Sequence, residues 1–225
     1  MPALPQTRLG RIAAGAALAL AAAAVFNMAA ARRAERRTPP TGRFVSAGGI
    51  RLHVIDRGAG RPVVVLHGNG SMAAEMMLSG VPDRLARNHR VLVFDRPGFG
   101  HSERGVRFAS PADQARLIRR ALRRLGVERP IILGHSWGTL VALEMALQDQ
   151  DDTAALVLVG GYYRPTARMD VPVLALPSVP GAGDLLSVTL WPLIARAMAM
   201  PAIRHLFAPA PVTDRPRTWP TRSSS

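Results

Sequence analysis

The sequence predicts an α/β fold with a doubly wound, mostly parallel sheet. Three observations support this prediction. Short apolar runs rich in valine, isoleucine and leucine recur along residues 43–163, as they do in strands buried on both faces. Segments with helical periodicity lie between these runs. A Gly-His-Ser-Trp-Gly stretch at residues 134–138 joins one of the runs to a helical segment through a sharp turn.

The composition limits the class of protein. A chain of 225 residues with 48% apolar residues can form one domain with an appended segment. There is no cysteine, so neither disulfides nor thiol chemistry is expected. The formal net charge is +14, and every basic residue is an arginine. These arginines are dispersed and are not interleaved with aromatic residues, so we expect no nucleic-acid partner.

Residues 1–42 are expected to form a membrane anchor or signal segment followed by a linker. Residues 12–31 carry no charge, and their length matches the roughly 20 residues with which a helix crosses a bilayer. Arginines precede and follow this stretch: Arg8, Arg11, Arg32, Arg33, Arg36 and Arg37. We expect membrane association through a single N-terminal anchor. Two alternatives stay open, a signal peptide cleaved near residues 29–31 with export of the rest, and a soluble alanine-rich helix.

The first half of the predicted domain begins with a hairpin. Residues 44–46 and 50–55 alternate apolar and polar side chains, and the glycines between them favour a turn. His53 lies within the second of these strands and is expected to be a strand residue. Residues 63–66 and 90–94 predict two buried strands, with a helical pattern over residues 71–87 that is interrupted at 80–82.

A helix is predicted to begin at Pro111, with Ser110 as its cap, and to end at Gly126. Its expected outer face carries five arginines, which we expect to be solvated: Arg116, Arg119, Arg120, Arg123 and Arg124. Residues 131–133 predict the next strand. Residues 155–159 predict a further buried strand after the following helix.

The turn at residues 134–138 has the features of a nucleophile elbow, with a strand at 131–133 before it and a helical segment at 139–147 after it. Gly134 and Gly138 leave space for the turn, and Ser136 would stand at its tip in a strained conformation. Asn69 follows the strand at 63–66 in a Gly-rich turn, and its preceding residue is Gly68. Because ligands bind beyond the carboxyl ends of such strands, Asn69 and Ser136 are expected to line one crevice.

Three motifs in order make the chain resemble the α/β-hydrolase superfamily, specifically its esterase-like members with a serine nucleophile. They are His-Gly-Asn-Gly at 67–70, Asp-Arg-Pro-Gly-Phe-Gly-His-Ser at 95–102, and Gly-His-Ser-Trp-Gly at 134–138. The resemblance covers residues 43 to about 207. It implies an α/β-hydrolase fold, Ser136 as the catalytic nucleophile, and an oxyanion hole from the backbone N–H groups of Asn69 and Trp137. It also implies that His67 and Asp95 hold their loops in place.

The resemblance implies a hydrolase acting on carboxylic esters or related acyl compounds without a cofactor. A dehalogenase would carry aspartate in place of Ser136, whereas cofactor-free haloperoxidase activity stays open. No metal is expected, because the histidines and carboxylates show no ligand spacing.

The chain departs from the family pattern after residues 43–163, which resemble the N-terminal part of the hydrolase core. Residues 164–213 resemble a partial lid and residues 214–225 an unstructured tail. The only candidates in the right order for the acid and the base are Asp170, Asp184 and His205. The missing strand-acid-strand-histidine pattern favours a C-terminally truncated or frame-shifted product, with an apolar strand edge left open. The alternative function is a catalytically incomplete remnant or a membrane-tethered binding domain.

Overall fold

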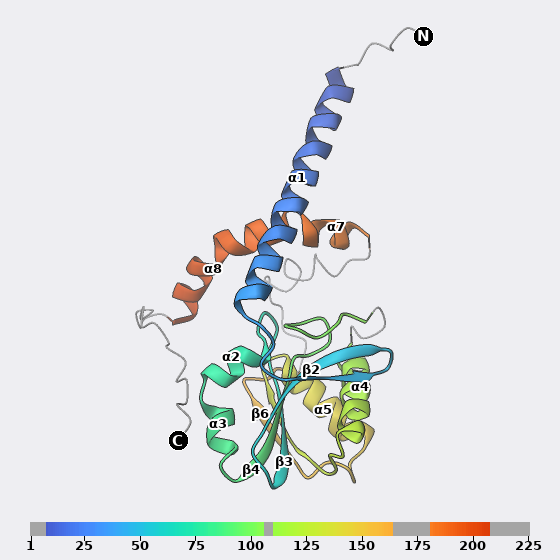
Figure 1. The fold of residues 1–225 in the computed structure, drawn as a ribbon, viewed down its shortest axis with the longest axis vertical. Coiled ribbons are helices and arrows are strands. Elements are labelled where there is room, and N and C mark those ends of the chain that lie inside the picture. The colour runs from blue at the N-terminus through green and yellow to red at the C-terminus, as the bar shows by residue number, and fades with distance from the viewer. Residues whose placement is uncertain (1–7, 106–109, 164–180, 208–225) are drawn as a thin grey trace. The chain divides into compact units, whose positions relative to one another are not determined.

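The computed structural model describes residues 8–105, 110–163 and 181–207, and the chain divides into two compact units. One unit, Pro40–Pro165, holds a six-stranded sheet in the order β1-β2-β4-β3-β5-β6 (Figure 1). Its strands are β1 (Arg43–Ala47), β2 (Ile50–Arg57), β3 (Arg61–Leu66), β4 (His89–Phe94), β5 (Ile131–His135) and β6 (Ala155–Val159). The predicted strands and the mostly parallel sheet are confirmed.

The order of the strands explains the mixed sheet. β1 and β2 form the predicted antiparallel hairpin, and β2 also pairs antiparallel with β4. From β4 onwards every pairing is parallel: β4 with β3, β3 with β5, and β5 with β6. β3 and β5 are neighbours although about 65 residues separate them in the chain, so the turns after both strands open on the same edge of the sheet.

The helices of this unit are α2 (Ala73–Leu78), α3 (Val81–Leu85), α4 (Pro111–Arg124) and α5 (Gly138–Gln148). α4 begins as predicted, because Ser110 Oγ accepts a hydrogen bond from the N–H of Asp113 at 3.1 Å. The interrupted helical pattern is resolved into α2 and α3, with Gly80 in a left-handed conformation between them.

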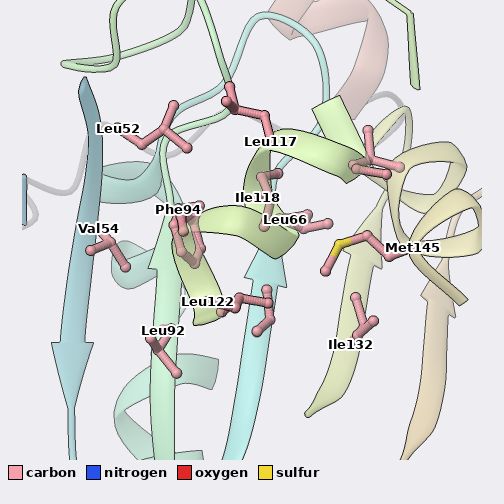
Figure 2. Close-up of a cluster of buried hydrophobic side chains, with 14 of the residues drawn as sticks. Leu52, Val54, Leu66, Leu92, Phe94, Leu117, Ile118, Leu122, Ile132 and Met145 are labelled. Carbon is pink, nitrogen blue, oxygen red and sulfur yellow. The ribbon is translucent and has the colours of Figure 1, made fainter. Parts of the chain in front are cut away.

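Alternate residues of β3 supply two separate apolar clusters, one on each face of the sheet. Val64 and Leu66 join the cluster formed with α4 and α5 (Figure 2). Val63 and Val65 join the second cluster, which includes Ala73 and Met77 of α2. The period of two along a strand therefore explains why the run is apolar at every position. Each face buries its own set of side chains under its own helices.

The prediction that Arg119 lies on a solvated helix face was wrong. Its side chain is 4% exposed. It donates hydrogen bonds to the backbone oxygens of Met145 and Asp149 at 2.9 and 2.8 Å and forms an ion pair with Asp152 at 2.8 Å. Arg119 therefore joins α4 to the end of α5 and to the turn that follows.

The prediction that residues 155–159 form a buried strand was also wrong in part. The strand exists, but Val157, Leu158 and Val159 are 42, 39 and 46% exposed. Among the strands that the structure describes, β6 is the last in the order and pairs with β5. Its apolar side chains are therefore more exposed than those of the central strands.

The other unit, Met1–Pro39 with Thr166–Ser225, contains α1 (Arg8–Arg37), α7 (Ala182–Val188) and α8 (Trp191–Phe207). α7 and α8 lie within the residues 164–213 that resemble a partial lid. Within α1, Gly10–Arg37 is long and apolar enough to cross a membrane, a property that signal sequences share. The tail expected at 214–225 lies outside the described residues.

Candidate active site

Ser136 lies between the end of β5 and the start of α5. Its backbone φ is 51°, in the left-handed region that residues other than glycine seldom adopt. This is the strain that the elbow motif predicts. The side chain is half-buried, and its backbone N–H donates to the oxygen of Val159 at 2.8 Å. The turn therefore holds the hydroxyl at the carboxyl edge of the parallel strands.

The elbow glycines are required by close backbone approach. A Cβ atom at Gly134 would stand 2.6 Å from the backbone oxygen of Gly138. A Cβ atom at Gly138 would stand 2.4 Å from the backbone oxygen of Leu66. Both neighbours are main-chain atoms of packed elements, so they cannot move aside. The two glycines thus let α5 start directly against β3 and β5.

The turn after β3 lies against Ser136. A Cβ atom at Gly68 would be 3.0 Å from Cβ of Ser136 and 3.4 Å from its Oγ. Asn69 is exposed, and Trp137 is half-buried at the N-cap of α5. Neither backbone N–H, of Asn69 or of Trp137, donates to an acceptor within the part of the chain that the structure describes. Both N–H groups are therefore available to a ligand, one beside Ser136 in sequence and one beside Gly68.

Arg96, which sequence reasoning passed over, organises the turn from beneath. It is fully buried, and its guanidinium donates to the oxygens of His67 at 2.8 Å and Gly68 at 3.0 Å, and to Asn69 Oδ1 at 2.7 Å. The same group lies 4.4 Å from the ring centroids of Phe99 and Trp137. Loss of water on burial lowers the pKa of Arg96 to about 9.

A further acceptor for Arg96 is the amide oxygen of Gln114, at 3.1 Å. The acceptors of these four bonds are neutral oxygens, so backbone carbonyls and side-chain amides share the positive charge. The sequence signal for this role is an arginine two residues after a buried strand, and that pattern alone does not distinguish a solvated residue from a buried one.

His67 is held as a neutral ring. Its Nε2 accepts a hydrogen bond from the N–H of Arg96 at 3.0 Å, so Nδ1 carries the proton and donates to the oxygen of Gly68 at 2.7 Å. Burial first, and then the charge of Arg96, lower the pKa of His67 to about 4. His67 is thus committed to the shape of its turn and does not supply a base.

A second buried pair, His53 and Asp95, holds the loop after β4. His53 Nε2 accepts from the N–H of Gly42 at 3.0 Å, so Nδ1 donates to Asp95 Oδ2 at 2.8 Å. The other Asp95 oxygen accepts from the N–H of Ala73 at 2.6 Å. Burial opposes ionisation of Asp95, yet hydrogen bonds from His53 and from the backbone of Ala73 and His101 hold its pKa below the ordinary value.

The sequence candidates for acid and base are not brought to Ser136 by the described structure. Asp170 lies outside the described residues, and Asp184 and His205 lie in α7 and α8 with side chains that are likewise outside them. Among the histidine side chains that the structure describes, none hydrogen-bonds to Ser136 Oγ. His135 beside it is exposed. No group of three or more histidines or carboxylates suited to a metal occurs within the described ranges.

Known hydrolases resemble this chain both in sequence and in structure. A sequence profile of the family described as the alpha/beta hydrolase fold matches residues 61–191. A 2-hydroxymuconate semialdehyde hydrolase of Pseudomonas putida is 34% identical over 134 residues, which are 56% of this chain and 46% of that protein. The chain therefore spans about half the length of this relative.

Two solved structures are similar. The meta-cleavage product hydrolase CumD of Pseudomonas fluorescens matches with a TM-score of 0.52 at 27% identity, over 56% of this chain and 47% of that one. An esterase of Exiguobacterium antarcticum matches with a TM-score of 0.54 at 26% identity, over 61% of this chain and 55% of that one.

Proposed function

The chain belongs to the α/β-hydrolase fold family, and on that premise we propose that it is a serine hydrolase acting on carboxylic esters or related acyl compounds through an acyl-enzyme on Ser136. The observation that carries the proposal is the left-handed φ of 51° at Ser136, in the turn between β5 and α5. Backbone strain of this kind costs about 1–3 kcal/mol and persists where function requires it.

The proposed chemistry begins with attack of Ser136 Oγ on the carbonyl carbon of the ester while a base takes the hydroxyl proton. The carbonyl oxygen becomes an oxyanion, to which the N–H groups of Asn69 and Trp137 donate. The N-terminus of α5 adds a partial positive charge at the same place. Collapse of the intermediate releases the alcohol, which receives the proton from the base. Water then cleaves the acyl-enzyme by the same steps.

The candidates for the base and the acid come from chain order alone. His205, with Asp170 or Asp184, follows Ser136 in the order serine, acid, histidine. The names of the relatives, a semialdehyde hydrolase and an esterase, support a small carbonyl compound as the substrate class. The choice among ester, thioester and related acyl groups is part of what an activity screen would decide.

One observation favours a second candidate function. No described histidine reaches Ser136 Oγ. A serine without a base is a poor nucleophile at its ordinary pKa. The alternative is therefore a catalytically incomplete domain that binds acyl compounds beside Ser136 and Asn69 without turning them over.

Hydrolysis of p-nitrophenyl esters by the purified full-length chain in detergent separates the two candidates. The hydrolase proposal expects steady turnover that is lost in both Ser136→Ala and His205→Gln. If turnover is lost only in Ser136→Ala, the base is a residue other than His205. Binding of the ester without product release, equal in all three proteins, would establish the alternative.

We further propose that α1 anchors the chain in a membrane. Gly10–Arg37 has a mean hydropathy of 2.0 in its most apolar window, of which 6% is buried. A helix this apolar and this exposed needs a non-aqueous surrounding. The alternative, cleavage as a signal peptide with export of the rest, predicts a mature chain that begins near residue 32. Intact mass of the protein from membrane and soluble fractions distinguishes the two.

A further inference from the structure

Asn27 is a polar residue in the apolar part of α1, and it is buried at 5% exposure. Its Nδ2 donates to the backbone oxygens of Val188 at 3.1 Å and Thr189 at 2.5 Å, at the junction of α7 and α8. Its Oδ1 accepts from Arg196 Nη1 at 3.1 Å. Both ends of the amide are therefore satisfied by the C-terminal helices of the same unit. Figure 1 shows α7 and α8 running across α1 near this point.

The surroundings of this contact are apolar and face outward. Large apolar side chains are exposed on α1 (Ile12, Leu18, Val25, Phe26 and Met28) and on the stretch from α7 through α8 (Leu185, Val188, Leu190, Leu193, Ile194, Met198 and Met200). The sequence of α8 contains no acidic residue, and its charged side chains are Arg196 and Arg204. The guanidinium of Arg196 also lies 5.7 Å from the ring of Phe26. Many exposed apolar side chains together with arginines have the character of a membrane-contacting face.

The position of Asn27 along α1 fixes the depth of the contact. Arg32, the first charge after the apolar stretch, is five residues further on, which is about 7.5 Å along the helix axis. The hydrocarbon core of a bilayer is about 30 Å thick, so Asn27 would lie inside it but near one boundary. An amide left without partners there costs several kcal/mol. If α1 spans the bilayer, the hydrogen-bond partners of Asn27 on α7 and α8 must therefore lie at the same depth as Asn27.

We propose that α1, α7 and α8 form one membrane-docked unit, in which α1 spans a bilayer of anionic phospholipid and α7–α8 lies in the interfacial layer against it, joined through Asn27. Trp191 at the start of α8 suits that layer, where tryptophan rings concentrate. Arg196 and Arg204 can extend their charged ends to phosphate groups while their stems stay in the apolar layer. This inference rests on the proposed anchor, and its test uses no turnover at Ser136.

The absence of cysteine permits a direct test with single labelled cysteines in the full-length chain. Leu18→Cys reports on α1, Met198→Cys on α8, and Arg120→Cys on an exposed position of α4 as the aqueous control. Each carries a nitroxide and is placed in vesicles of phosphatidylcholine and phosphatidylglycerol. Collisions with oxygen, which partitions into lipid, are compared with collisions with a water-soluble nickel chelate.

The proposal expects the ratio of oxygen to nickel collisions at positions 18 and 198 to exceed that at position 120 several-fold. A water-like ratio at 198 with a lipid-like ratio at 18 would overturn the docking of α7–α8 and leave the anchor standing. Water-like ratios at both would overturn the anchor as well. Shielding of 198 from both reagents, unchanged when lipid is replaced by detergent, would mean that a second copy of the chain covers this surface, and would equally overturn the proposal.

The role of Asn27 is tested by Asn27→Leu, which keeps the branched shape of the side chain and removes the hydrogen bonds. Ala29→Leu at an exposed position of α1 is the matched control. In Asn27→Leu the nitroxide at position 198 is expected to gain mobility and nickel collisions, while position 18 stays in lipid. No change at position 198 would show that Asn27 does not hold the two parts together.

Discussion

Arg96 Nη2 donates a hydrogen bond to Asn69 Oδ1 at 2.7 Å from a guanidinium that is completely buried. The same side chain lies against Trp137, so one residue contacts both of the segments whose N–H groups are proposed to bind an oxyanion. A buried cation is costly, and the hydrogen bonds from Arg96 to the turn at 67–69 offset that cost. The proposed oxyanion hole would thus depend on Arg96 for the position of both segments.

Replacing Arg96 by methionine is expected to lower both stability and reactivity. The buried oxygens of His67 and Gln114 lose the bond from Arg96, at about 1–3 kcal/mol for each group that stays unpaired, while the oxygen of Gly68 keeps its bond from His67 Nδ1. Reaction of Ser136 with an acylating probe is expected to slow by on the order of 10²-fold, the effect of one misplaced oxyanion donor. Arg116→Met on the exposed face of α4 is the control. Its free energy of unfolding should lie within about 0.5 kcal/mol of that of the parent. An unchanged probe rate in folded Arg96→Met would contradict this role.

Ser136→Gly is expected to be more stable than Ser136→Ala, because glycine adopts φ of 51° without the steric cost that alanine keeps. The difference in the free energy of unfolding should be about 1 kcal/mol in favour of glycine. Ser79, at φ −65° in the C-cap of α2, offers the matched comparison. There the order should reverse, with alanine the more stable. Urea unfolding of the four variants measures both differences. A lower free energy of unfolding for Ser136→Gly than for Ser136→Ala would show that the turn is not strained.

Stability is expected to fall as the pH falls from about 6.5 to about 4, owing to His67. The pKa of His67 is lowered from 6.5 to about 4, so the folded protein keeps the ring neutral while the unfolded chain takes up a proton. The contribution is therefore fully present above the unfolded pKa and is lost as the pH drops toward the folded one. Its upper size is about 3 kcal/mol, from about 2.5 pKa units.

Urea unfolding measured across this range tests the effect of His67. The slope of stability against pH should flatten in His67→Gln and stay as in the parent in His89→Gln. Equal slopes in all three proteins would mean that another group causes the loss of stability at low pH. Asp95, whose pKa is held below 3.8, adds its own loss only at lower pH.

Arg119 and Arg120 are adjacent on α4 but are expected to respond differently to truncation. Arg119→Ala removes the side-chain bonds to the carbonyl oxygens of Met145 and Asp149 and the ion pair with Asp152, so the free energy of unfolding should fall by about 2–4 kcal/mol. Arg120→Ala should change it by no more than about 0.5 kcal/mol, since its side chain is exposed. Similar losses of unfolding free energy in both variants would mean that the hydrogen bonds of Arg119 contribute no more to stability than the exposed Arg120 does.

The strands, the helices and the elbow were predictable because each depends on local sequence. Valine-rich runs can bury both faces, Ser110 and Pro111 begin a helix by their own chemistry, and two glycines around Ser136 allow one sharp turn. These features need no knowledge of distant residues.

The roles of Arg96 and Arg119 were not predictable, because their partners are remote. Arg119 pairs with oxygens 26 to 34 residues away, and Arg96 with a turn 27 to 29 residues before it. Helix periodicity shows that an arginine such as Arg119 lies between the buried and the exposed face of its helix. Whether its side chain is buried depends on acceptors from other parts of the chain, which periodicity does not reveal. The exposure of β6 likewise depends on its place in the strand order, which the sequence of the strand does not contain.

The central claim is that Ser136 is an activated nucleophile. The most direct measurement is the intact mass of the full-length chain after reaction with a fluorophosphonate, beside Ser136→Ala. The account predicts one adduct on the parent chain and none on the variant. A parent chain that is folded and stays unmodified would contradict the account and leave the chain as an acyl-binding member of its family.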